Sequence, residues 1–568
     1  MKMKYVVIGA VAGGMTAAMK IRRNDDKAEI IVYDKDTDIS YSGCSLAYYI
    51  SGVIDNRKNI VPRDSQYFKK FNVDVKTDHE VLKVDVQNKK VIVKDLKTGN
   101  IFEDGFDKLI IATGAHPVIP QIEGIELEGI FVLRNVKDAD RIKEFINNNL
   151  PKKALIVGGG YIGLEMAEAL KVLGMDVCIV EKQENILPNL DSDMARLVES
   201  YLEENGVAIR KGTSVLRFEG DKRVKRAILS DGSKIEADFV LLAVGVRPST
   251  KFLEESGIQL LPNGAIKVDE YMRTNIEGIF AAGDCAAVYF KLNGKTMYVP
   301  LGSTANKMGR IAGENATGGS MKFSGVLATS IFKVFDLTVA QTGYTEKMAQ
   351  EDGIEYEVGH ITKPHITTAY PGAEKMTIKA LAELSSRKVI GAQIVGTKGV
   401  DKRIDVLATA IFAGLTTDDL FQLDLAYAPP FSSAKDPIHY VGMVMSNFLD
   451  KRKFNCTQEK LLEKMQKGED FIVLDVRTPE QYKAKHIKGA INIPLEMLYE
   501  KMNELSREKQ IIVYCNSGVS SNIAQNILQQ NGFRKVYNLS GGISNVTLEQ
   551  LLEKNTSDSF SSSSSPQV

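Results

Sequence analysis

Two stretches of the chain share one order of residues: an unbroken apolar run, a cluster of glycines, and then a segment with helical character. The first is KYVVIGAVAGGMTAAMKIRR at 4–23, and the second is KKALIVGGGYIGLEMAEAL at 152–170. An apolar run bounded by glycines is typical of a buried strand in a parallel sheet. Each stretch therefore predicts a strand, a tight turn and a helix.

Such a turn is suited to bind a pyrophosphate, because backbone N–H groups and the helix dipole face the anion. The first turn carries Gly9, Gly13 and Gly14, with Val11 at the middle position of GxGxxG. The second is a complete GxGxxG formed by Gly158, Gly160 and Gly163.

An acidic residue is expected about 20 positions further on, where it binds a ribose hydroxyl. Asp34 in IIVYDK and Glu181 in CIVEK occupy these positions after the two glycine clusters. A carboxylate repels a 2′-phosphate, so Glu181 favours NADH over NADPH, although Lys182 is its neighbour.

Three more apolar runs end in glycine. They are KLIIATGAHP with Thr113 and Gly114, FVLLAVGVRP with Gly245, and EGIFAAGDCA with Asp284. The two strand–turn–helix units, about 150 residues apart, suggest two dinucleotides facing one another, and these three runs fit that arrangement.

The pattern changes after about residue 455. DFIVLDVRTPEQYKAKHIKGAINIP is followed by KQIIVYCNSGVSSNIAQNIL, which predicts a buried strand, a short loop headed by Cys515 and a helix. Residues 451–458 are interpreted as a linker. The serine-rich end, 555–568, is expected to be disordered.

Composition narrows the class of protein. A chain of 568 residues suggests three or four domains at about 150 residues each. Lys+Arg and Asp+Glu are equal at 72 each, which gives no reason to expect a nucleic-acid or anionic-membrane partner. No apolar run approaches the ~20 residues of a membrane span. Five widely spaced cysteines argue against a disulfide framework and for a reducing cytoplasm.

The ATG, GxGxxG and GIFAAGD segments, in this order, resemble the two-dinucleotide flavoprotein disulfide reductase family. The resemblance implies FAD at the first turn, NAD(P)H at the second, and Asp284 on the flavin ribityl chain. It implies an α/β fold with an FAD-binding domain (1–115 and 244–320), an NAD-binding domain (116–243) and an α+β dimerisation domain (321–450). Cys285, beside Asp284, is expected to be a packing residue.

One branch of that family has a single cysteine in a loop of the form S-x-x-x-C-x-L-x-Y, which Ser40, Cys44, Leu46 and Tyr48 match. The branch includes coenzyme A disulfide reductase, NADH oxidase and NADH-dependent persulfide/polysulfide reductases. By resemblance, Cys44 is the redox-active nucleophile. Its pKa is expected to fall toward or below neutrality, with a flavin ring and a helix N-terminus as the stabilising groups.

Further segments resemble the same branch: YPGA at 370–373, KGVDKRIDVL at 398–407 and LAYAPPFSSAKDP at 425–437. Tyr427, and with it Tyr370, is expected to complete the active site of the partner subunit in a homodimer. The phosphates of coenzyme A need cations and hydrogen-bonding groups, for which the candidates are Thr16, Lys20, Arg23, Ser40, Lys307, Arg310 and Lys435. Arg22 lies on the same helix.

The sequence departs at three positions from that of the coenzyme A disulfide reductases. Gly43 precedes the cysteine where the coenzyme A disulfide reductases have asparagine, Ala47 replaces a proline, and Ala369 stands beside Tyr370 in place of a second tyrosine. These changes weaken the case for a bulky symmetric disulfide and leave that for a persulfide intact.

The C-terminal motifs resemble a single rhodanese domain, an α/β fold expected over 456–550. The family usually has arginine at the sixth position of the loop after the cysteine, where this chain has Ser520. Cys515 is expected to carry sulfane sulfur, with weak activity toward the anion thiosulfate; the alternative is that the domain is a degraded docking module. His486 is expected to have a structural role.

Together these features predict an FAD-dependent NADH oxidoreductase that reduces coenzyme A persulfide, polysulfide or coenzyme A disulfide at Cys44, coupled to sulfur handling at Cys515. One alternative is an NADH oxidase in which Cys44 cycles through a sulfenic acid. Another is a redox or sulfur sensor, against which the intact second GxGxxG argues.

Overall fold

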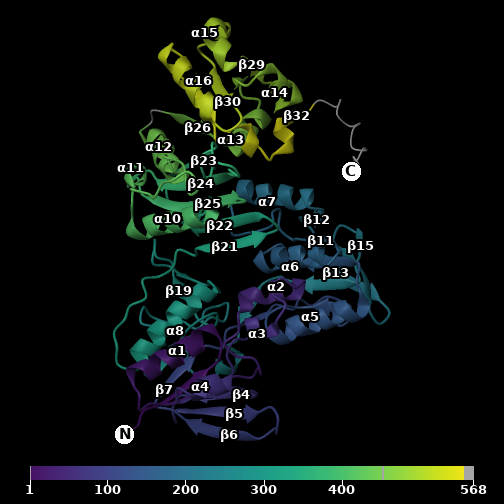
Figure 1. The fold of residues 1–568 in the computed structure, drawn as a ribbon, viewed down its shortest axis with the longest axis vertical. Coiled ribbons are helices and arrows are strands. Elements are labelled where there is room, and N and C mark those ends of the chain that lie inside the picture. Colours follow the sequence, from purple (N-terminus) through teal and green to yellow (C-terminus); the bar gives the residue numbers. More distant parts are fainter. Residues whose placement is uncertain (1, 451–452, 555–568) are drawn as a thin grey trace. The chain divides into compact units, whose positions relative to one another are not determined.

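The computed structural model describes residues 2–450 and 453–554, which form two compact units (Figure 1). The first comprises the chain up to Pro188 together with Leu202–Ser330, and the second comprises Asn189–Tyr201 together with the chain from Ile331 onward. The predicted disordered tail, 555–568, lies outside the described residues. The finer domain limits inferred from the sequence remain predictions.

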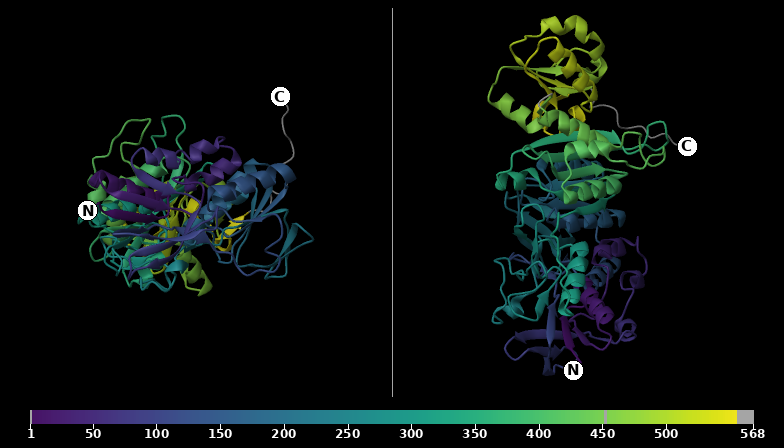
Figure 2. Two further views of the ribbon diagram at one scale, coloured as in Figure 1. Left: turned by 90° about the horizontal axis from the view of Figure 1, so that it is seen from below. Right: turned by 90° about the vertical axis from the view of Figure 1, so that its left-hand side faces the viewer.

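The first unit contains a parallel sheet in the order β18-β7-β1-β2-β3. Its strands are β1 (Lys4–Ile8), β2 (Glu29–Tyr33), β3 (Val73–Lys76), β7 (Lys108–Ile111) and β18 (Ile279–Ala281). Helix α1 (Ala12–Asn24) follows β1 directly and packs along α8 (Gly302–Ala316), so segments almost 300 residues apart lie side by side (Figure 2, purple and teal). The apolar run of β1 is buried, as its pattern predicts.

A second parallel sheet in this unit has the order β12-β11-β10-β16-β9. Its strands are β9 (Ile130–Phe131), β10 (Lys153–Val157), β11 (Asp176–Val180), β12 (Val207–Arg210) and β16 (Phe239–Leu242). Helix α6 (Tyr161–Val172) follows β10, and α5 (Val136–Asn149) precedes it. Both predicted strand–turn–helix units are therefore confirmed.

Smaller elements complete the first unit. Two three-stranded sheets are formed by β4 (His79–Asp85), β5 (Lys90–Asp95) and β6 (Ile101–Gly105), and by β13 (Val215–Gly220), β14 (Val224–Leu229) and β15 (Lys234–Glu236). Two strand pairs are β8 (Ala115–Pro117) with β17 (Val246–Pro248), and β19 (Val288–Tyr289) with β20 (Thr296–Met297). The short helices are α2 (Leu46–Ser51), α3 (Arg57–Ile60) and α4 (Ser65–Lys69).

The second unit begins with the sheet β21-β22-β25-β24-β23. Its strands are β21 (Ser330–Val334), β22 (Leu337–Gly343), β23 (Tyr356–Pro364), β24 (Lys375–Glu383) and β25 (Val389–Gly396). Helices α9 (Glu346–Glu351), α10 (Val400–Ala413), α11 (Thr417–Gln422) and α12 (Pro437–Leu449) accompany it. Most of α7 (Ser192–Glu204) also belongs to this unit.

The C-terminal region of the second unit forms the parallel sheet β26-β31-β30-β27-β29. Its strands are β26 (Phe454–Cys456), β27 (Phe471–Asp475), β29 (Ile491–Asn492), β30 (Gln510–Tyr514) and β31 (Val536–Leu539), and β28 (Lys485–Ile487) pairs with β32 (Leu552–Lys554). Its helices are α13 (Gln458–Gln466), α14 (Pro479–Ala484), α15 (Leu498–Lys501) and α16 (Val519–Gln530).

This sheet corrects the linker inferred from the sequence. Residues 454–456 form strand β26, and Cys456 is buried in the core of the C-terminal sheet. The short polar stretch obscured a strand because only three residues enter the sheet. Among residues 2–450 and 453–554, no helix has the length and apolar character needed to span a bilayer.

Candidate active site

The two acidic residues expected to bind ribose have the same local geometry. Asp34, after β2, accepts hydrogen bonds from the backbone N–H of Ala10 (2.6 Å) and of Asp36 (2.8 Å). Glu181, after β11, accepts them from Gly159 (2.8 Å) and Gln183 (2.9 Å). Each carboxylate is thus fixed against the glycine turn that precedes the neighbouring helix.

Burial raises the pKa of the Asp34 carboxyl to about 6, although the N–H groups of Asp36 and Ala10 oppose the shift. Ligand hydroxyls that donate to the carboxylate would favour its charged form.

The Val11 departure from GxGxxG is compatible with the turn. Val11 is the N-cap of α1 with φ −108°, and Gly160 is the N-cap of α6 with φ −82°, so neither position needs a left-handed backbone. By contrast, a Cβ on Gly9 (φ +104°) would lie 2.2 Å from the carbonyl oxygen of Ala112. Position 9 therefore requires glycine, whereas position 11 can hold valine.

The glycine-ending strands meet one another. Thr113 donates from Oγ1 to the carbonyl oxygen of Ser249 (2.8 Å), and the Ser249 N–H donates to the Gly114 carbonyl (3.0 Å). The carbonyl of Gly245 accepts from the Val118 N–H (2.9 Å). The ATG and GVRP segments are therefore joined to each other by hydrogen bonds in the first unit.

Asp284 has a cationic partner that the sequence analysis did not identify. Arg134 Nη2 lies 2.8 Å from Asp284 Oδ2, and the same nitrogen would be 3.5 Å from a Cβ on Gly114. Arg134 precedes the capping box of α5, where Asn135 and Asp138 bond reciprocally. Its 150-residue separation from Asp284 left no local signal in the sequence.

Cys44 lies in a short 3-10 turn, Gly43–Ser45, directly before α2, and it is exposed. The loop is tied to the first glycine turn, because the Ser40 N–H donates to the Ala10 carbonyl (2.8 Å). Ser40 has φ +49°, an uncommon backbone conformation for serine. The Ser42 N–H bonds the Ile60 carbonyl (2.8 Å), which fixes the other side of the loop.

The protein groups around Cys44 do not by themselves lower the pKa of its thiol, and the expected stabilisation by a flavin stays a prediction. Partial burial raises the pKa of the Cys44 thiol, the negative charges of Glu165 and Asp284 raise it further, and Arg134 acts in the opposite direction. The chain by itself therefore disfavours the thiolate, and the following helix, α2, has only six residues.

Glu165 is a second residue that sequence reasoning missed. It lies on α6, and burial together with the charge of Glu168 raises the pKa of its carboxyl to about 7. Its charge also raises the pKa of Tyr48. A glutamate within an apolar segment after the GxGxxG glycines was the available signal.

The other cysteines have different surroundings. Cys285 is fully buried, bonds through Sγ to the carbonyls of Ile111 and Ala282 (3.4 Å each), and has its pKa raised by burial to about 11. This agrees with a packing role. All five cysteines of the chain are free, and only Cys44 is exposed.

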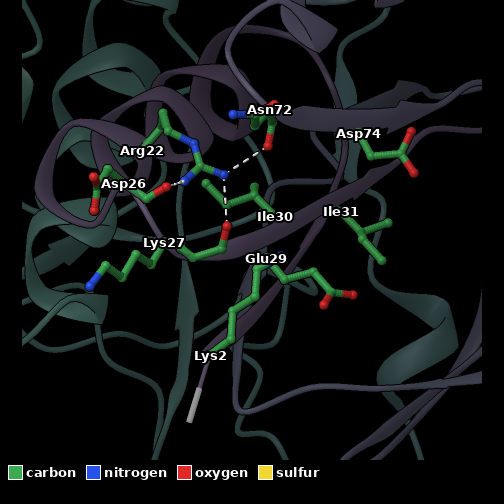
Figure 3. A pocket seen from close by; sticks show the side chains of 10 residues that line it. Lys2, Arg22, Asp26, Lys27, Glu29, Ile30, Ile31, Asn72 and Asp74 are labelled. Atoms are coloured by element: carbon green, nitrogen blue, oxygen red, sulfur yellow. Dashed lines mark hydrogen bonds between the residues drawn. The ribbon is translucent and has the colours of Figure 1, made fainter.

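Five of the candidate coenzyme A residues lie on α1 and α8, which pack together. Thr16 Oγ1 donates to Asn306 (2.8 Å), and Lys20 Nζ lies 2.6 Å from Glu314 Oε2. Arg23 and Lys307 are exposed, as is Arg310. Arg22 is excluded as a coenzyme A contact, because its guanidinium donates to the backbone carbonyls of residues 25, 26, 28, 71 and 72. The bonds to residues 26, 28 and 72 are drawn in Figure 3.

Tyr370, Tyr427 and Lys435 belong to the second unit, and all three are exposed. A buried ion pair supports their segment: Arg403 Nη2 lies 2.8 Å from Asp436 Oδ2. This contact joins the KGVDKRIDVL and LAYAPPFSSAKDP segments. The expected roles of these residues at a partner's site remain predictions.

Cys515 follows β30 and heads the loop that leads into α16. The N–H of Gly518 lies 3.2 Å from its Sγ, and Ser521 Oγ lies 3.3 Å from the same atom. Gly518 is the N-cap of α16 with φ +89°. His486 stacks on Tyr482 (ring centroids 4.0 Å apart) and bonds its carbonyl (2.9 Å), as expected for a structural residue.

Arg477 contacts the Cys515 loop, but its guanidinium is bound mainly to Asp475. Arg477 bonds both oxygens of Asp475 and approaches Asn516 only at 3.4 Å. No arginine in the described loop replaces the one absent at Ser520.

Comparison with known proteins shows which proteins share this organisation. Residues 3–309 match the family described as pyridine nucleotide-disulphide oxidoreductase, 329–437 match its dimerisation domain, and 457–549 match the rhodanese-like domain.

Relatives resemble the chain over most of their own length. An NADH oxidase of Methanocaldococcus jannaschii is 37% identical over 77% of this chain and 97% of its own, and a CoA-dependent NAD(P)H sulfur oxidoreductase of Pyrococcus abyssi is 34% identical over 78% and 98%. The structure of an NAD-dependent persulfide reductase from A. fulgidus is 41% identical with a TM-score of 0.90, covering 96% of this chain and 100% of that one. The chain thus belongs to the pyridine nucleotide-disulphide oxidoreductase family and carries a rhodanese-like domain after the dimerisation domain.

Proposed function

We propose that the protein is an FAD-dependent NADH oxidoreductase that reduces coenzyme A persulfide, polysulfide or coenzyme A disulfide through Cys44. The observation that carries the proposal is Cys44 itself: it is the one exposed cysteine, on a loop tied by Ser40 to the first glycine turn. The persulfide reductase and sulfur oxidoreductase names of the relatives support this choice.

The residues present fit two dinucleotides. Asp34 and Glu181 each place a carboxylate against a glycine turn, and a Cβ on Gly160 would meet no atom within 4 Å, which leaves room at the N-terminus of α6. Asp34 and Asp284 would hold FAD, and Glu181 would hold the adenosine ribose of NADH. FAD, when bound, would relay two electrons from NADH to sulfur.

The step at Cys44 needs only one protein sulfur. The Cys44 thiolate attacks the outer sulfur of R–S–SH, the substrate S–S bond breaks, and the R-thiolate leaves with a proton from a nearby acid. The persulfide on Cys44 then accepts two electrons and releases hydrosulfide. With a symmetric disulfide, a mixed disulfide forms in the same way.

Coenzyme A is proposed as the carrier because it has a 3′-phospho-ADP end. Arg23, Lys307 and Arg310 expose positive charge where α1 meets α8. Lys20 contributes less, because Glu314 neutralises part of its charge. A homodimer is proposed because the chain matches the dimerisation domain, and Tyr427, with Tyr370, would serve the partner's site.

In the rhodanese-like domain, Cys515 would carry sulfane sulfur. The Gly518 N–H stabilises negative charge on Sγ, while the absence of a loop arginine disfavours a small dianion such as thiosulfate. A thiol persulfide or polysulfide is therefore the proposed donor. Because the domain is tethered to the reductase, even slow delivery of sulfur toward Cys44 would have an effect.

A second candidate is an NADH oxidase, since one relative has that name. Anaerobic NADH consumption with and without coenzyme A persulfide separates the two. The proposal predicts rapid consumption that requires the persulfide, whereas consumption that occurs only when oxygen is admitted would favour the oxidase.

A further inference from the structure

A buried hydrogen-bond network in the second unit joins the sheet of the dimerisation domain to the rhodanese-like domain. His360, on β23, has Nε2 2.6 Å from Asp193 Oδ2 and Nδ1 2.8 Å from Ser540 Oγ. The backbone N–H of His360 also donates to Ser540 Oγ (3.1 Å). The side chains of His360 and Asp193 are each 7% exposed.

The hydrogen-bond pattern identifies the donor and the acceptor in each contact. The Asp193 carboxylate only accepts, so the imidazole carries a proton on Nε2 and donates it to Asp193. In the neutral imidazole Nδ1 is then the acceptor for the hydroxyl proton of Ser540. The His360 backbone N–H, both of its ring nitrogens and the Ser540 hydroxyl each have a partner in this arrangement.

Asp193 is a fixed, charged acceptor. Lys379 Nζ lies 2.8 Å from Asp193 Oδ1 and 3.1 Å from Asp191 Oδ2, and it contacts Glu346 (2.5 Å). Burial would raise the pKa of Asp193, but the charge of Lys379 and the hydrogen bond from His360 outweigh it and hold that pKa well below its usual range. The three carboxylates therefore surround an ammonium group.

Ser540 leads into the backbone that supports the Cys515 loop. Residues 540–544, here called the supporting segment, place the Ile543 N–H 2.9 Å from the Cys515 carbonyl and the Ser544 N–H 3.0 Å from the Asn516 carbonyl. A Cβ on Gly542 would lie 2.5 Å from the Cys515 carbonyl oxygen, so the fit is close. A shift of this segment moves the loop whose Gly518 N–H contacts Sγ.

The residue that follows the segment binds the same sheet. Asn545 approaches Thr362 and Thr377 through its side-chain amide, at 3.2 to 3.4 Å. The supporting segment is thus anchored at both of its ends to strands β23 and β24.

We propose that His360 is a positioning residue for Cys515: by bridging Asp193 and Ser540, it fixes the supporting segment and so keeps the Gly518 N–H against the Cys515 sulfur. Only the sulfur chemistry of Cys515 rests on the proposed function; the positioning does not. The Ser–His–Asp order does not make Ser540 a nucleophile, because in hydrolytic triads serine pairs with Nε2 and aspartate with Nδ1, the reverse of this arrangement.

The test is the rate at which iodoacetamide alkylates Cys515 across a range of pH, followed on the Cys515 peptide by mass spectrometry in the full-length flavoprotein. His360→Ala and His360→Gln remove the Nδ1 acceptor for the Ser540 hydroxyl. In His360→Asn, the side-chain carbonyl can take the place of Nδ1 and accept the same hydrogen bond. We expect Ala and Gln to slow the alkylation of Cys515 at neutral pH about three- to tenfold, the effect of weakening about one hydrogen bond, here from the Gly518 N–H to the sulfur. His360→Asn should restore most of the rate.

Ser540→Ala provides a second route to the same result and should slow the alkylation of Cys515 as His360→Ala does. His365→Ala, at a partly buried histidine of the same domain whose ring contacts the Glu374 backbone, is the matched control and should leave alkylation unchanged. NADH-dependent dye reduction should be equal in all variants. Wild-type alkylation profiles in His360→Ala or in Ser540→Ala would overturn the proposal. If the profiles shift as expected but wild-type protein accepts no sulfane sulfur, the proposed function fails and the positioning role stands.

Discussion

Arg134 and Asp284 form an ion pair in the first unit, with Nη2 2.8 Å from Oδ2, although 150 residues separate them in the chain. Asp284 is the residue proposed to bind the flavin ribityl chain. Arg134 therefore holds in place the carboxylate that we propose binds FAD.

Replacing Arg134 with alanine should weaken FAD binding about ten- to a hundredfold, because a hydrogen bond to a charged group contributes about 1.5 to 3 kcal/mol. The measurement is the dissociation constant of FAD from the reconstituted apoprotein by flavin fluorescence. Arg223→Ala removes an exposed arginine paired with Glu128 and serves as the control. Unchanged or tighter FAD binding in Arg134→Ala would show that the pair competes with the flavin.

The second prediction concerns the nicotinamide nucleotide. Glu181→Gln removes the charge that would repel a 2′-phosphate, so the ratio of kcat/KM for NADH to that for NADPH should fall about tenfold, equivalent to about 1.4 kcal/mol. Because Glu181 also binds the N–H groups of Gly159 and Gln183, the value for NADH itself should fall.

Lys182→Ala is the matched control, since Lys182 is the exposed neighbour of Glu181. It should leave the ratio nearly unchanged. A wild-type preference for NADPH that disappears in Lys182→Ala would reverse the assignment.

The fingerprints were predictable from sequence because their geometry is local. Asp34 and Glu181 follow their glycines at a fixed spacing, and each accepts an N–H from its own turn. Arg134 and the contacts of His360 were not predictable, since their partners lie far away in the sequence. Glu165 was missed because charged residues on helices usually face solvent, although its apolar surroundings in the sequence were a signal. The strand Phe454–Cys456 was missed for a related reason: its pairing with β31, and not its own pattern, makes it a strand.

Glu165 gives a pH-dependent prediction. Folding raises the pKa of its carboxyl from 4.5 to about 7 through burial and the charge of Glu168, so the folded protein binds this proton more tightly than the unfolded chain. The associated stability is present below pH 4.5 and is lost as pH rises through about 7. Glu165→Gln should therefore raise the melting temperature at pH 8 more than at pH 5.

The same variant should lower the pKa of Cys44, because the Glu165 charge contributes to raising it. Alkylation of Cys44 at pH 8 should then be faster in Glu165→Gln than in wild-type protein. Glu168→Gln should instead lower the pKa of Glu165 and move its transition to lower pH. Equal Cys44 alkylation in wild type and Glu165→Gln would exclude the electrostatic coupling.

The rhodanese-like loop yields a gain-of-function prediction. Ser520→Arg restores a positive charge at the sixth loop position and should raise the rate of sulfur transfer from thiosulfate about tenfold. Ser520→Gln, which is long but neutral, should not. If both variants match the wild type, charge at this position does not limit the reaction.

Cys515→Ser should slow NADH consumption with polysulfide as the sulfur donor and spare turnover with preformed coenzyme A persulfide. The steady-state rates with the two substrates provide the comparison. An equal loss with both would indicate a structural role for Cys515, and no loss with either would mean that the domain does not deliver sulfur.

Cys44→Ser tests the central claim, because it removes one sulfur atom and leaves both glycine turns untouched. The measurement is anaerobic NADH oxidation by the full-length flavoprotein with coenzyme A persulfide, alongside NADH-to-dye transfer, which needs only bound flavin. We expect persulfide-dependent oxidation to fall at least about a thousandfold, as removal of an essential nucleophile does in other enzymes, while dye reduction and FAD content stay at wild-type levels. Persulfide reduction at the wild-type rate in Cys44→Ser would contradict the account.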